Sequence, residues 1–520
     1  MKRLLCLLSA LLMLFTCGCG NDSTNECDHD YELVKTVDAS CTEDGYKKYE
    51  CSECGDSYKK EISKTGHCYE NGLCIYCSEI DFEEPPAQTA YEIGEVTITF
   101  THTMGNKLQS VLNDYIVEFN KIYPNIHIEH QSAGGWSDIN EQIKADISSG
   151  YTPNIVYCNP DHVAMYNKTQ SVVVLDKLIN STAVIEGTNE VMGLTAEQKA
   201  DFIESYYNEG LAYGDGKMYT LPMSKSTDVL YYNKTFFNEH GLKVPTTWDE
   251  MWAVCEQILA IDPDCYPLGY DSEYNWFITM CEQMKSGYTS AEDGGKYLFN
   301  NDTNKAFVKK LHDMYQKGYF TTQELYGSYS SSLFVETTDT RCYMSIASSG
   351  GAAYQMSNWD TADGSFAFEV GVAPIPQYDA NNKKVISQGP SLCILQNGNT
   401  SEQQIVASWL FIKFLCTNVD FQAEFSMASG YTPVLKSVTE NEAYAAWLAK
   451  GNGYENLIAR CVQVCINNAD TCFVPDAFPG SSELRTEIGD MLYRCLSASA
   501  TGNTLDAVIQ AAFEKASQTP

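Results

Sequence analysis

Two hydrophobic periods follow one another in the main part of the chain. Apolar and polar residues alternate over 96–100, which predicts a strand. Apolar residues then recur every three or four positions over 108–119, which predicts one face of a helix. Strands at 126–128 and 155–158 repeat this pattern around a helix at 139–147. This βαβαβ order predicts an α/β fold with a parallel sheet covered by helices.

The loops at the carboxyl ends of these strands are the expected place for a ligand, because parallel sheets bind ligands at that edge. They comprise residues 101–104, 133–136 and 159–162. The chain continues with further strands and helices, and it closes with two amphipathic helices. Thr246 or Thr247 is the expected N-cap of a helix over 248–259.

The stretch 221–233, LPMSKSTDVLYYN, joins a polar half to an apolar half. Pro222 removes a backbone donor and suits the entry to an edge or crossing strand. We therefore predict that this stretch carries the chain from one globular lobe into a second, with the ligand site between them. Lys225 is a candidate for the anionic end of a ligand, and Trp276, in a predicted loop, is a candidate for stacking on one. A second candidate crossing lies at 386–395.

Length and charge narrow the class of protein. A chain of 520 residues exceeds one ordinary core, so two or three domains are expected. The chain has 34 Lys and Arg against 68 Asp and Glu, a net charge of −34. Such a chain repels nucleic acid and anionic membrane surfaces, so no nucleic-acid partner is expected. Solubility outside the cell accounts for the charge.

The N-terminus carries an export signal. A basic pair precedes an apolar run at 4–15 that is too short to span a bilayer. Small residues and cysteines follow, so that residues 1–19 resemble a bacterial lipoprotein signal, in which a cysteine becomes the lipidated first residue. Cys19 is the expected lipidation site, and Cys17 is the alternative. The resemblance implies a protein on the outside of the cell membrane, held there by its lipid anchor only.

Residues 20–80 form a separate Cys-rich unit, and an acidic linker with two prolines follows at 81–94. Two CxxC pairs with interspersed histidines have the spacing that holds a tetrahedral metal ion, so zinc is expected here. The ligands of one Cys3His site would be His29, Cys41, Cys51 and Cys54. The ligands of a second site would be His67, Cys74 and Cys77, with Cys68 or Cys27.

The elements SCTEDG, YECSECG and GH of this unit resemble the zinc-ribbon-type repeats of surface proteins from anaerobic gut bacteria. The alternative is a disulfide framework, which export favours. Either set of crosslinks would stabilise a unit that is too small to bury a sufficient core.

Four motifs beyond residue 95 carry a more specific resemblance. In chain order they are EFNKIYPNIHIE, GKMYTLPMSKSTDVLYYNKTFFNEHGLKVPTTWDEM, GVAPIP with SQGPSL, and SGYTPVLKS. Over about four-fifths of the chain the sequence resembles the extracellular solute-binding proteins of ABC importers, in the carbohydrate-uptake group.

The resemblance implies a type II, two-lobe α/β fold with hinge crossings. It divides the chain into a first lobe, residues 95–222 and 390–436, and a second lobe, residues 223–389 and 437–520. It also implies a monomer that receives a small-molecule ligand and delivers it to the ABC permease subunits.

Within this family the motifs are most similar to the binders of sn-glycerol-3-phosphate and glycerophosphodiesters. The positions carried over from that group, together with Asp161, which adjoins the position of an expected glutamate, are Trp136, Asp161, Ser226, Ser348, Gly389, Tyr431 and Arg485. Their chemistry suits a phosphorylated polyol, because a phosphate attracts a guanidinium, hydroxyls and backbone N–H groups, and an indole face packs on a carbon skeleton.

The expected function is therefore binding and delivery of a small carbohydrate-class solute, with glycerol-3-phosphate or a glycerophosphodiester as the first candidate. A neutral sugar or oligosaccharide is the alternative ligand. A surface adhesion or sensor protein is a further alternative function. An enzyme is not expected, because HExxH, GxSxG and P-loop motifs are absent from the sequence. No cofactor is expected for the binding domain.

Overall fold

The computed structural model of the chain falls into two compact units, Met1–His67 and Cys68–Pro520, which we describe separately. The described residues are 29–41, 43–67, 69–70, 73–74, 90–335, 341–357, 359–360, 365–453 and 456–519. The predicted lipidation site, its alternative and three of the metal candidates lie outside the described residues: Cys17, Cys19, Cys27, Cys68 and Cys77. None of the described helices is both long and apolar enough to cross a membrane.

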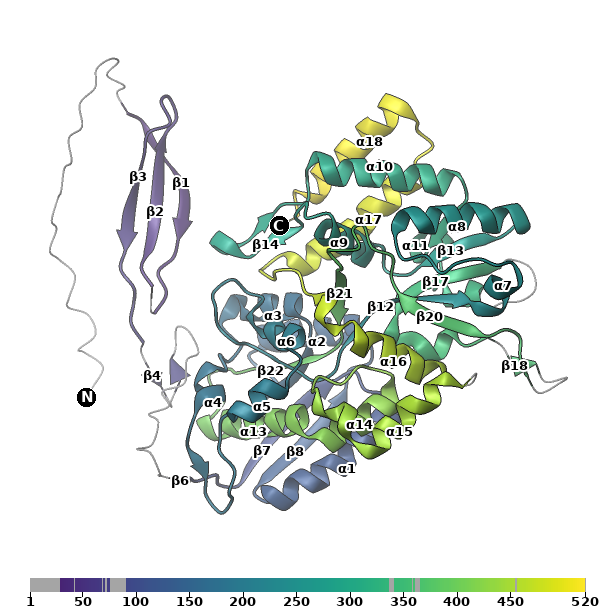
Figure 1. Ribbon diagram of the computed structural model, residues 1–520. Coiled ribbons are helices and arrows are strands. Elements are labelled where there is room, and N and C mark those ends of the chain that lie inside the picture. The colour runs from purple at the N-terminus through teal and green to yellow at the C-terminus, as the bar shows by residue number, and fades with distance from the viewer. Residues whose placement is uncertain are drawn as a thin grey trace, which may run out of the picture. The chain divides into compact units, whose positions relative to one another are not determined.

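The first unit is a three-stranded antiparallel sheet in the order β1-β2-β3 (Figure 1). Its strands are β1 (Tyr31–Val37), β2 (Gly45–Cys51) and β3 (Ser57–Ile62). A register irregularity between Leu33 and Lys35 interrupts β1. Very few of its strand residues are buried, so the sheet has almost no core of its own.

The second unit contains a five-stranded sheet built on the predicted βαβαβ order. Strand β7 (Val96–His102) pairs in parallel with β8 (Ile126–Ser132) and β9 (Ile155–Cys158). Strands β22 (Ser391–Ile394) and β11 (Leu221–Pro222) extend the sheet in antiparallel fashion beyond β9. The sheet is therefore mixed rather than wholly parallel.

The helices of the βαβαβ segment are α1 (Asn106–Ile122) and α2 (Trp136–Ser149). Gly150 ends α2 in the left-handed conformation, with φ of 79°. Helix α13 (Glu402–Thr417) also packs on this sheet, since Phe411 contacts both Phe100 of β7 and Phe119 of α1. Helices α1 and α13, which are far apart in the sequence, therefore share one core.

A second sheet runs in the order β16-β13-β17-β12-β21-β23, and β20 also pairs with β12. The strands are β12 (Ser226–Asn233), β13 (Tyr266–Tyr270), β16 (Phe320–Thr322), β17 (Cys342–Ser348), β20 (Val370–Pro374), β21 (Val385–Gln388) and β23 (Cys472–Phe473). Strand β12 lies at the centre, because it pairs with β17, β20 and β21 (Figure 1).

The core beside this second sheet is aromatic. Trp276 lies within helix α9 (Glu273–Gln283), is fully buried, and stacks on Tyr270 with ring centroids 4.4 Å apart. The prediction of Trp276 as a loop residue that contacts ligand is therefore wrong. Helix α8 (Trp248–Ile261) begins as predicted, because Thr247 accepts a hydrogen bond from the backbone of Glu250.

The chain passes between the two sheets at the predicted stretch, since β11 belongs to the first sheet and β12 to the second. It returns between β21 and β22 through Gly389. A third segment lies against the first crossing, because Lys225 and Thr432 exchange backbone hydrogen bonds of 2.9 and 2.6 Å. The two sheets therefore meet where three chain segments run side by side.

The remaining elements complete the fold. The other α-helices are α3 (Pro160–Tyr166), α4 (Asp176–Asn180), α5 (Ala196–Asp201), α6 (Glu204–Tyr207), α7 (Lys234–Glu239), α10 (Asp302–Gln316), α11 (Gln323–Tyr326), α12 (Ser331–Phe334), α14 (Val419–Ser429), α15 (Glu442–Ala449), α16 (Leu457–Asn467), α17 (Ser481–Leu496) and α18 (Gly502–Ala516). The short strands are β4 (Tyr69–Glu70), β5 (Leu73–Cys74), β6 (Ala90–Tyr91), β10 (Val184–Ile185), β14 (Thr289–Ser290), β15 (Lys296–Tyr297), β18 (Trp359–Asp360) and β19 (Ser365–Phe366). The 3₁₀ turns are η1 (Asn167–Thr169), η2 (Asn208–Leu211), η3 (Glu292–Gly294), η4 (Ser349–Gln355), η5 (Ser437–Glu440), η6 (Lys450–Asn452) and η7 (Ala469–Thr471).

Candidate ligand-binding site

A cavity of about 560 Å³ lies in the second unit, where elements of the two sheets face each other. Its wall includes the N-terminal ends of α2 and α3, which follow β8 and β9, together with the chain crossings and α17. The structure brings together around this cavity all seven predicted ligand-binding positions: Trp136, Asp161, Ser226, Ser348, Gly389, Tyr431 and Arg485.

Trp136 forms an aromatic wall of the cavity. It is the first residue of α2, after Gly135 at the N-cap, and its ring is nearly parallel to that of Tyr157, with centroids 6.3 Å apart. Burial raises the pKa of the Tyr431 phenol, and a hydrogen bond with the Trp136 side chain partly offsets that rise. Trp136 is only partly buried, so it keeps an accessible apolar surface.

Gly389 shapes the second crossing. Its φ is +93°, and a Cβ atom there would lie 2.8 Å from the carbonyl oxygen of Ser224 and 3.0 Å from the Cα of Lys225. Both the conformation and the close packing therefore require glycine. Ser226 lies beside it at the start of β12, buried at 4% exposure.

Ser348 and Tyr431 both lie beside Gly350, in the turn that follows β17. Ser348 is the N-cap of η4, and its hydroxyl accepts a hydrogen bond of 3.3 Å from the backbone of Gly350. A Cβ at Gly350 would lie 3.1 Å from the Tyr431 ring. The Ser348 hydroxyl, which has a second lone pair and one proton, remains able to bond a ligand.

Arg485 projects from α17 and is the one arginine among the described residues that line the cavity. Its Nη2 donates to Asn275 Oδ1 at 2.6 Å, and its Nη1 lies 4.0 Å from Asp161 Oδ2. Its guanidinium also lies over the Tyr274 ring, 5.0 Å from the centroid. Two buried atoms, Nε of Arg485 and Oδ1 of Asp161, have no hydrogen-bond partner among the described residues. A ligand or water would satisfy a donor and an acceptor here.

Lys225 does not face the cavity, which corrects its prediction as a ligand contact. Its side chain is fully buried, and Nζ donates to Glu209 Oε1 at 2.5 Å, Ser391 Oγ at 2.9 Å and the Gly389 carbonyl at 3.3 Å. An ammonium group taken out of water needs such partners. Lys225 therefore connects the two chain crossings on the side away from the cavity.

Several wall residues were not predicted from the sequence. They include Tyr274, Asn275, Tyr288, Tyr329, Glu209 and Asp476. Two of them could have been predicted from the periodicity of helix α9. Tyr274, Asn275 and Ile278 lie on the face of the helix that lines the cavity, whereas Trp276 faces the core.

Carboxylates outnumber cations on the wall. Asp161, Glu209 and Asp476 face a single arginine, although Glu209 is paired with the buried Lys225. Asp476 accepts a hydrogen bond of 2.9 Å from the backbone of Ala291. Burial lowers the pKa of His162, so this imidazole on the wall is neutral at pH 7.

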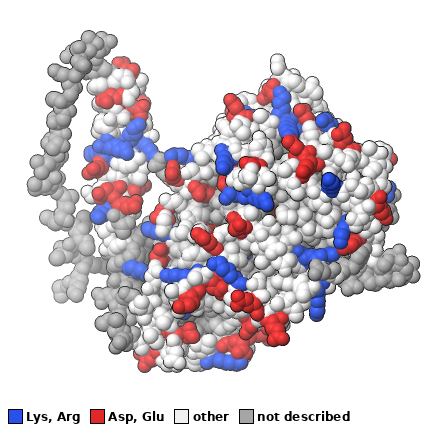
Figure 2. Space-filling view, viewed as in Figure 1, with Lys and Arg blue, Asp and Glu red and all other residues white. Residues whose placement is uncertain are grey.

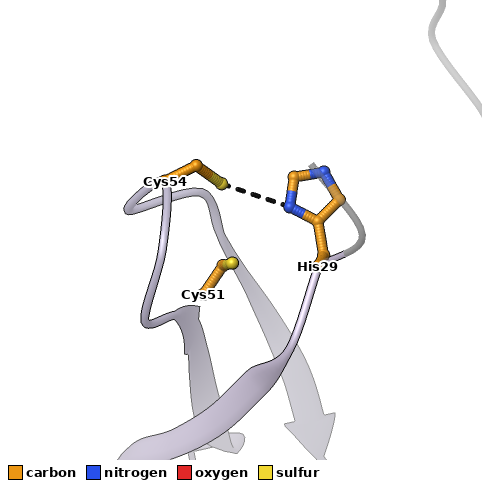
Figure 3. A group of neighbouring side chains, drawn as sticks. All are labelled: His29, Cys51 and Cys54. Carbon is orange, nitrogen blue, oxygen red and sulfur yellow. Dashed lines mark hydrogen bonds between the residues drawn. The ribbon is translucent and has the colours of Figure 1, made fainter. Parts of the chain in front are cut away.

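A second, separate group of polar residues lies in the first unit. The ligand atoms of His29, Cys51 and Cys54 lie within 4.8 Å of one another, and Cys54 Sγ is 3.2 Å from His29 Nδ1 (Figure 3). Backbone N–H groups of Cys54 and Glu53, followed by the His29 side chain, lower the pKa of Cys51 to about 6. A thiolate beside an imidazole and a second thiol is a donor set that suits a metal ion.

Cys41 does not join this group, which corrects the predicted first ligand set. It lies in the loop between β1 and β2, whereas Cys51 ends β2 at the opposite end of that seven-residue strand. The backbone of Gly66 donates to the Cys41 carbonyl, so Cys41 lies beside the segment that leads to His67. The antiparallel register thus separates the two cysteines by roughly 20 Å of strand.

Two sheets joined by chain crossings around one polar cavity define the class of two-lobe binding proteins. The profile of the bacterial extracellular solute-binding proteins matches residues 114–451. The chain belongs to this family, whose members are extracellular substrate-binding components of ABC importers and are not enzymes.

Known relatives agree with this assignment. The sn-glycerol-3-phosphate-binding periplasmic protein UgpB of Yersinia pestis bv. Antiqua is 25% identical over 363 residues, covering 66% of this chain and 75% of the relative. UgpB of Salmonella typhimurium is 24% identical over 369 residues, covering 68% and 78%.

Solved structures share the fold. UgpB from Mycobacterium tuberculosis, in complex with glycerophosphocholine, aligns with a TM-score of 0.61 at 19% identity, covering 81% of this chain and 98% of that one. The sugar-binding protein MalE from Xanthomonas citri aligns with a TM-score of 0.63 at 18% identity, covering 82% and 97%. The predicted α/β, two-lobe fold class is confirmed.

Proposed function

We propose that this chain captures sn-glycerol-3-phosphate or a glycerophosphodiester outside the cell and delivers it to the permease subunits of an ABC importer. The observation that carries the proposal is Arg485, whose guanidinium lies on the cavity wall with a buried Nε that has no hydrogen-bond partner among the described residues. The relatives named for glycerol-3-phosphate binding support the same ligand class.

The chemistry of the cavity suits each part of such a ligand. A phosphate would receive donors from Arg485, from the hydroxyls of Ser226, Ser348 and Tyr431, and from the Gly389 backbone. The glycerol carbons would pack on Trp136. These donors come from segments of both lobes, so one ligand that contacts them all would favour the closed arrangement.

Asp161 offers a hydrogen-bond acceptor to the hydroxyl groups of the ligand. Its Oδ1 atom is buried without a partner among the described residues, and a carboxylate oxygen accepts hydrogen bonds from hydroxyl groups. A cavity of about 560 Å³ also lies within the size range of pockets that enclose drug-sized ligands. A glycerophosphodiester therefore fits the space as well as glycerol-3-phosphate does.

A neutral sugar or oligosaccharide is the second candidate ligand. Asp161 and Asp476 on the wall favour it, because negative charge without a close ion pair in a low-dielectric site disfavours an anionic ligand. Sugar hydroxyls would satisfy the same acceptors without the cost of bringing a phosphate near them.

Titration calorimetry of the purified chain with glycerol-3-phosphate, a glycerophosphodiester and maltose separates the two candidates. We expect at least one phosphorylated ligand to bind stoichiometrically and to remain chemically unchanged. Binding of maltose alone would establish the neutral-sugar alternative. Turnover of any ligand would contradict the role as a binding component.

The first unit is proposed to hold zinc. His29, Cys51 and Cys54 supply three of the four donors that a structural zinc site needs, and Cys27 is the fourth by its position in the sequence. Bound zinc would supply the stability that the exposed sheet lacks. Metal analysis of the purified chain tests this: retained zinc supports it, and disulfides in place of zinc would contradict it.

The anchor and the lobe limits remain proposals. Lipidation at Cys19, with the unit at 20–80 and the linker at 81–94 as a spacer, would hold the receptor on the outer face of the membrane. The proposed lobes are 95–222 with 390–436, and 223–389 with 437–520. Mass spectrometry of the mature N-terminus decides between Cys19 and Cys17.

A further inference from the structure

The sheet of the first unit presents two different faces. Side chains alternate between the faces along each strand, and the register aligns Leu33, Tyr49 and Tyr58 in one row across β1, β2 and β3. Lys47 and Lys60 follow on the same face, directly opposite each other. We call this the tyrosine face, and it comprises Tyr31, Leu33, Lys47, Tyr49, Tyr58 and Lys60.

Tyrosine rings form an open platform on this face. The Tyr58 ring stacks on Tyr49 with centroids 5.1 Å apart and an interplanar angle of 11°. Tyr31 meets Tyr58 edge-on at 4.9 Å, across the small side chain of Cys51. Tyr58 is 48% exposed and the adjacent Leu33 is 49% exposed. Tyr31 and Tyr49 are partly buried, so Tyr58 and Leu33 form the exposed part of the platform, and a cluster of exposed apolar groups of this kind is typical of an interaction site.

The lysines of the two faces differ in their partners. On the opposite face Lys48 pairs with Glu50 at 2.9 Å, and Lys59 lies over the Tyr46 ring at 3.9 Å. Within the described part of the chain, neither Lys47 nor Lys60 has a carboxylate within 4.0 Å. Like charges directly opposite in a sheet are destabilising, so a bound anion would relieve the repulsion between these two lysines.

We propose that the tyrosine face binds a carboxylated polysaccharide, with sugar rings on the tyrosines and uronate groups on Lys47 and Lys60. Flat C–H faces of sugar rings suit the negative face of a phenol ring, and carboxylates complete the lysine pair. Figure 2 shows the lysines of this unit as a blue band between red groups, so the positive charge is local. Polyol phosphates lack rings to stack on the tyrosines.

Binding of the purified full-length protein to immobilised polygalacturonate tests the proposal. Dextran presents rings without charge, poly-L-glutamate presents charge without rings, and oligo-dT represents nucleic acid. The test variants are Lys47→Gln with Lys60→Gln, and Tyr58→Ala. The matched control is Lys48→Gln with Lys59→Gln, which removes the same charge from the same strands on the opposite face.

Polygalacturonate should bind more tightly than the three other polymers. Both test variants should weaken that binding by about tenfold or more, while the control stays within about twofold of the unmodified chain. Hydrogen exchange of the β2 amides checks that each variant keeps the sheet. Equal losses in test and control variants, equal binding of poly-L-glutamate, preference for oligo-dT, or no binding to polygalacturonate would each overturn the proposal.

Discussion

Lys225 and Glu209 form a buried ion pair behind the chain crossings, with Nζ 2.5 Å from Oε1 and side chains 0% and 2% exposed. The same ammonium group bonds the Gly389 carbonyl and the Ser391 hydroxyl, and the Lys225 backbone exchanges hydrogen bonds with Thr432. One residue therefore connects all three chain segments that join the two sheets. Glu209 also reaches the cavity wall, so this residue belongs both to the chain crossings and to the candidate site.

Removal of one partner should be costly. Lys225→Met leaves the Glu209 carboxylate buried and unpaired, and we expect a loss of about 3–5 kcal/mol in the free energy of unfolding, measured by urea denaturation. Lys225→Met with Glu209→Gln should recover much of that loss. The exposed pair of Lys309 and Asp506 offers the control, since Lys309→Met should cost at most about 1 kcal/mol. Equal costs at both pairs would contradict the argument.

Gly389→Ala should damage both the hinge and the site. Its φ of +93° and the 2.8 Å approach to the Ser224 carbonyl leave no room for a Cβ. We expect a loss of stability of about 1–3 kcal/mol and a weaker affinity for the ligand, because the shifted peptide carries a wall donor. Gly398→Ala is the matched control, because a Cβ there meets no atom within 4 Å. Unchanged ligand affinity in Gly389→Ala would exclude a role for this backbone in the site.

Arg485→Ala tests the phosphate end of the site. Loss of the guanidinium should weaken glycerol-3-phosphate binding by about 2–5 kcal/mol, and Arg485→Lys should restore only part of it because the forked donor geometry is lost. Arg494→Ala, on the exposed side of the same helix α17, should leave binding unchanged. Calorimetry measures all three. A glycerol-3-phosphate affinity insensitive to Arg485→Ala would favour the neutral-sugar alternative.

The local parts of this fold were predictable, and the errors have physical causes. The βαβαβ segment follows from side-chain periodicity alone, and the start of α8 from its threonine N-cap. The sequence does not reveal that Trp276 lies in a helix, because the N-cap of α9, Ser272, has the left-handed conformation with φ of 60° and makes no side-chain capping hydrogen bond. The role of Lys225 could not be predicted because its three hydrogen-bond partners lie 16, 164 and 166 residues away in the sequence. The assignment of Cys41 as a ligand is wrong because the strand register decides which cysteines lie close together, and the register cannot be inferred from the CxxC spacing.

Asp228 should make stability depend on pH. It is 2% exposed on β12, and its carboxylate accepts hydrogen bonds from Gln388 at 3.2 Å and Tyr270 at 3.4 Å. Burial raises the pKa of Asp228 to about 7 from its ordinary 3.8, although the Tyr270 hydrogen bond lowers it in part. Between these values the folded chain binds this proton and the unfolded chain does not. Stability from this group is therefore complete below pH 3.8 and is lost as pH rises through 7.

Asp228→Asn removes that titration and keeps a side chain of the same shape that can bond both neighbours. The free energy of unfolding of the variant should therefore rise, relative to the unmodified chain, by roughly 1.4 kcal/mol for each pH unit between pH 5 and 7, and level off above pH 7. Urea denaturation at pH 5, 6, 7 and 8 measures the difference. Asp249→Asn, whose side chain is 88% exposed, should give a flat difference over the same range. Parallel pH profiles for Asp228→Asn and the unmodified chain would show that Asp228 is ionised in the folded protein at pH 5, in which case its bonds to Gln388 and Tyr270 outweigh the cost of burial.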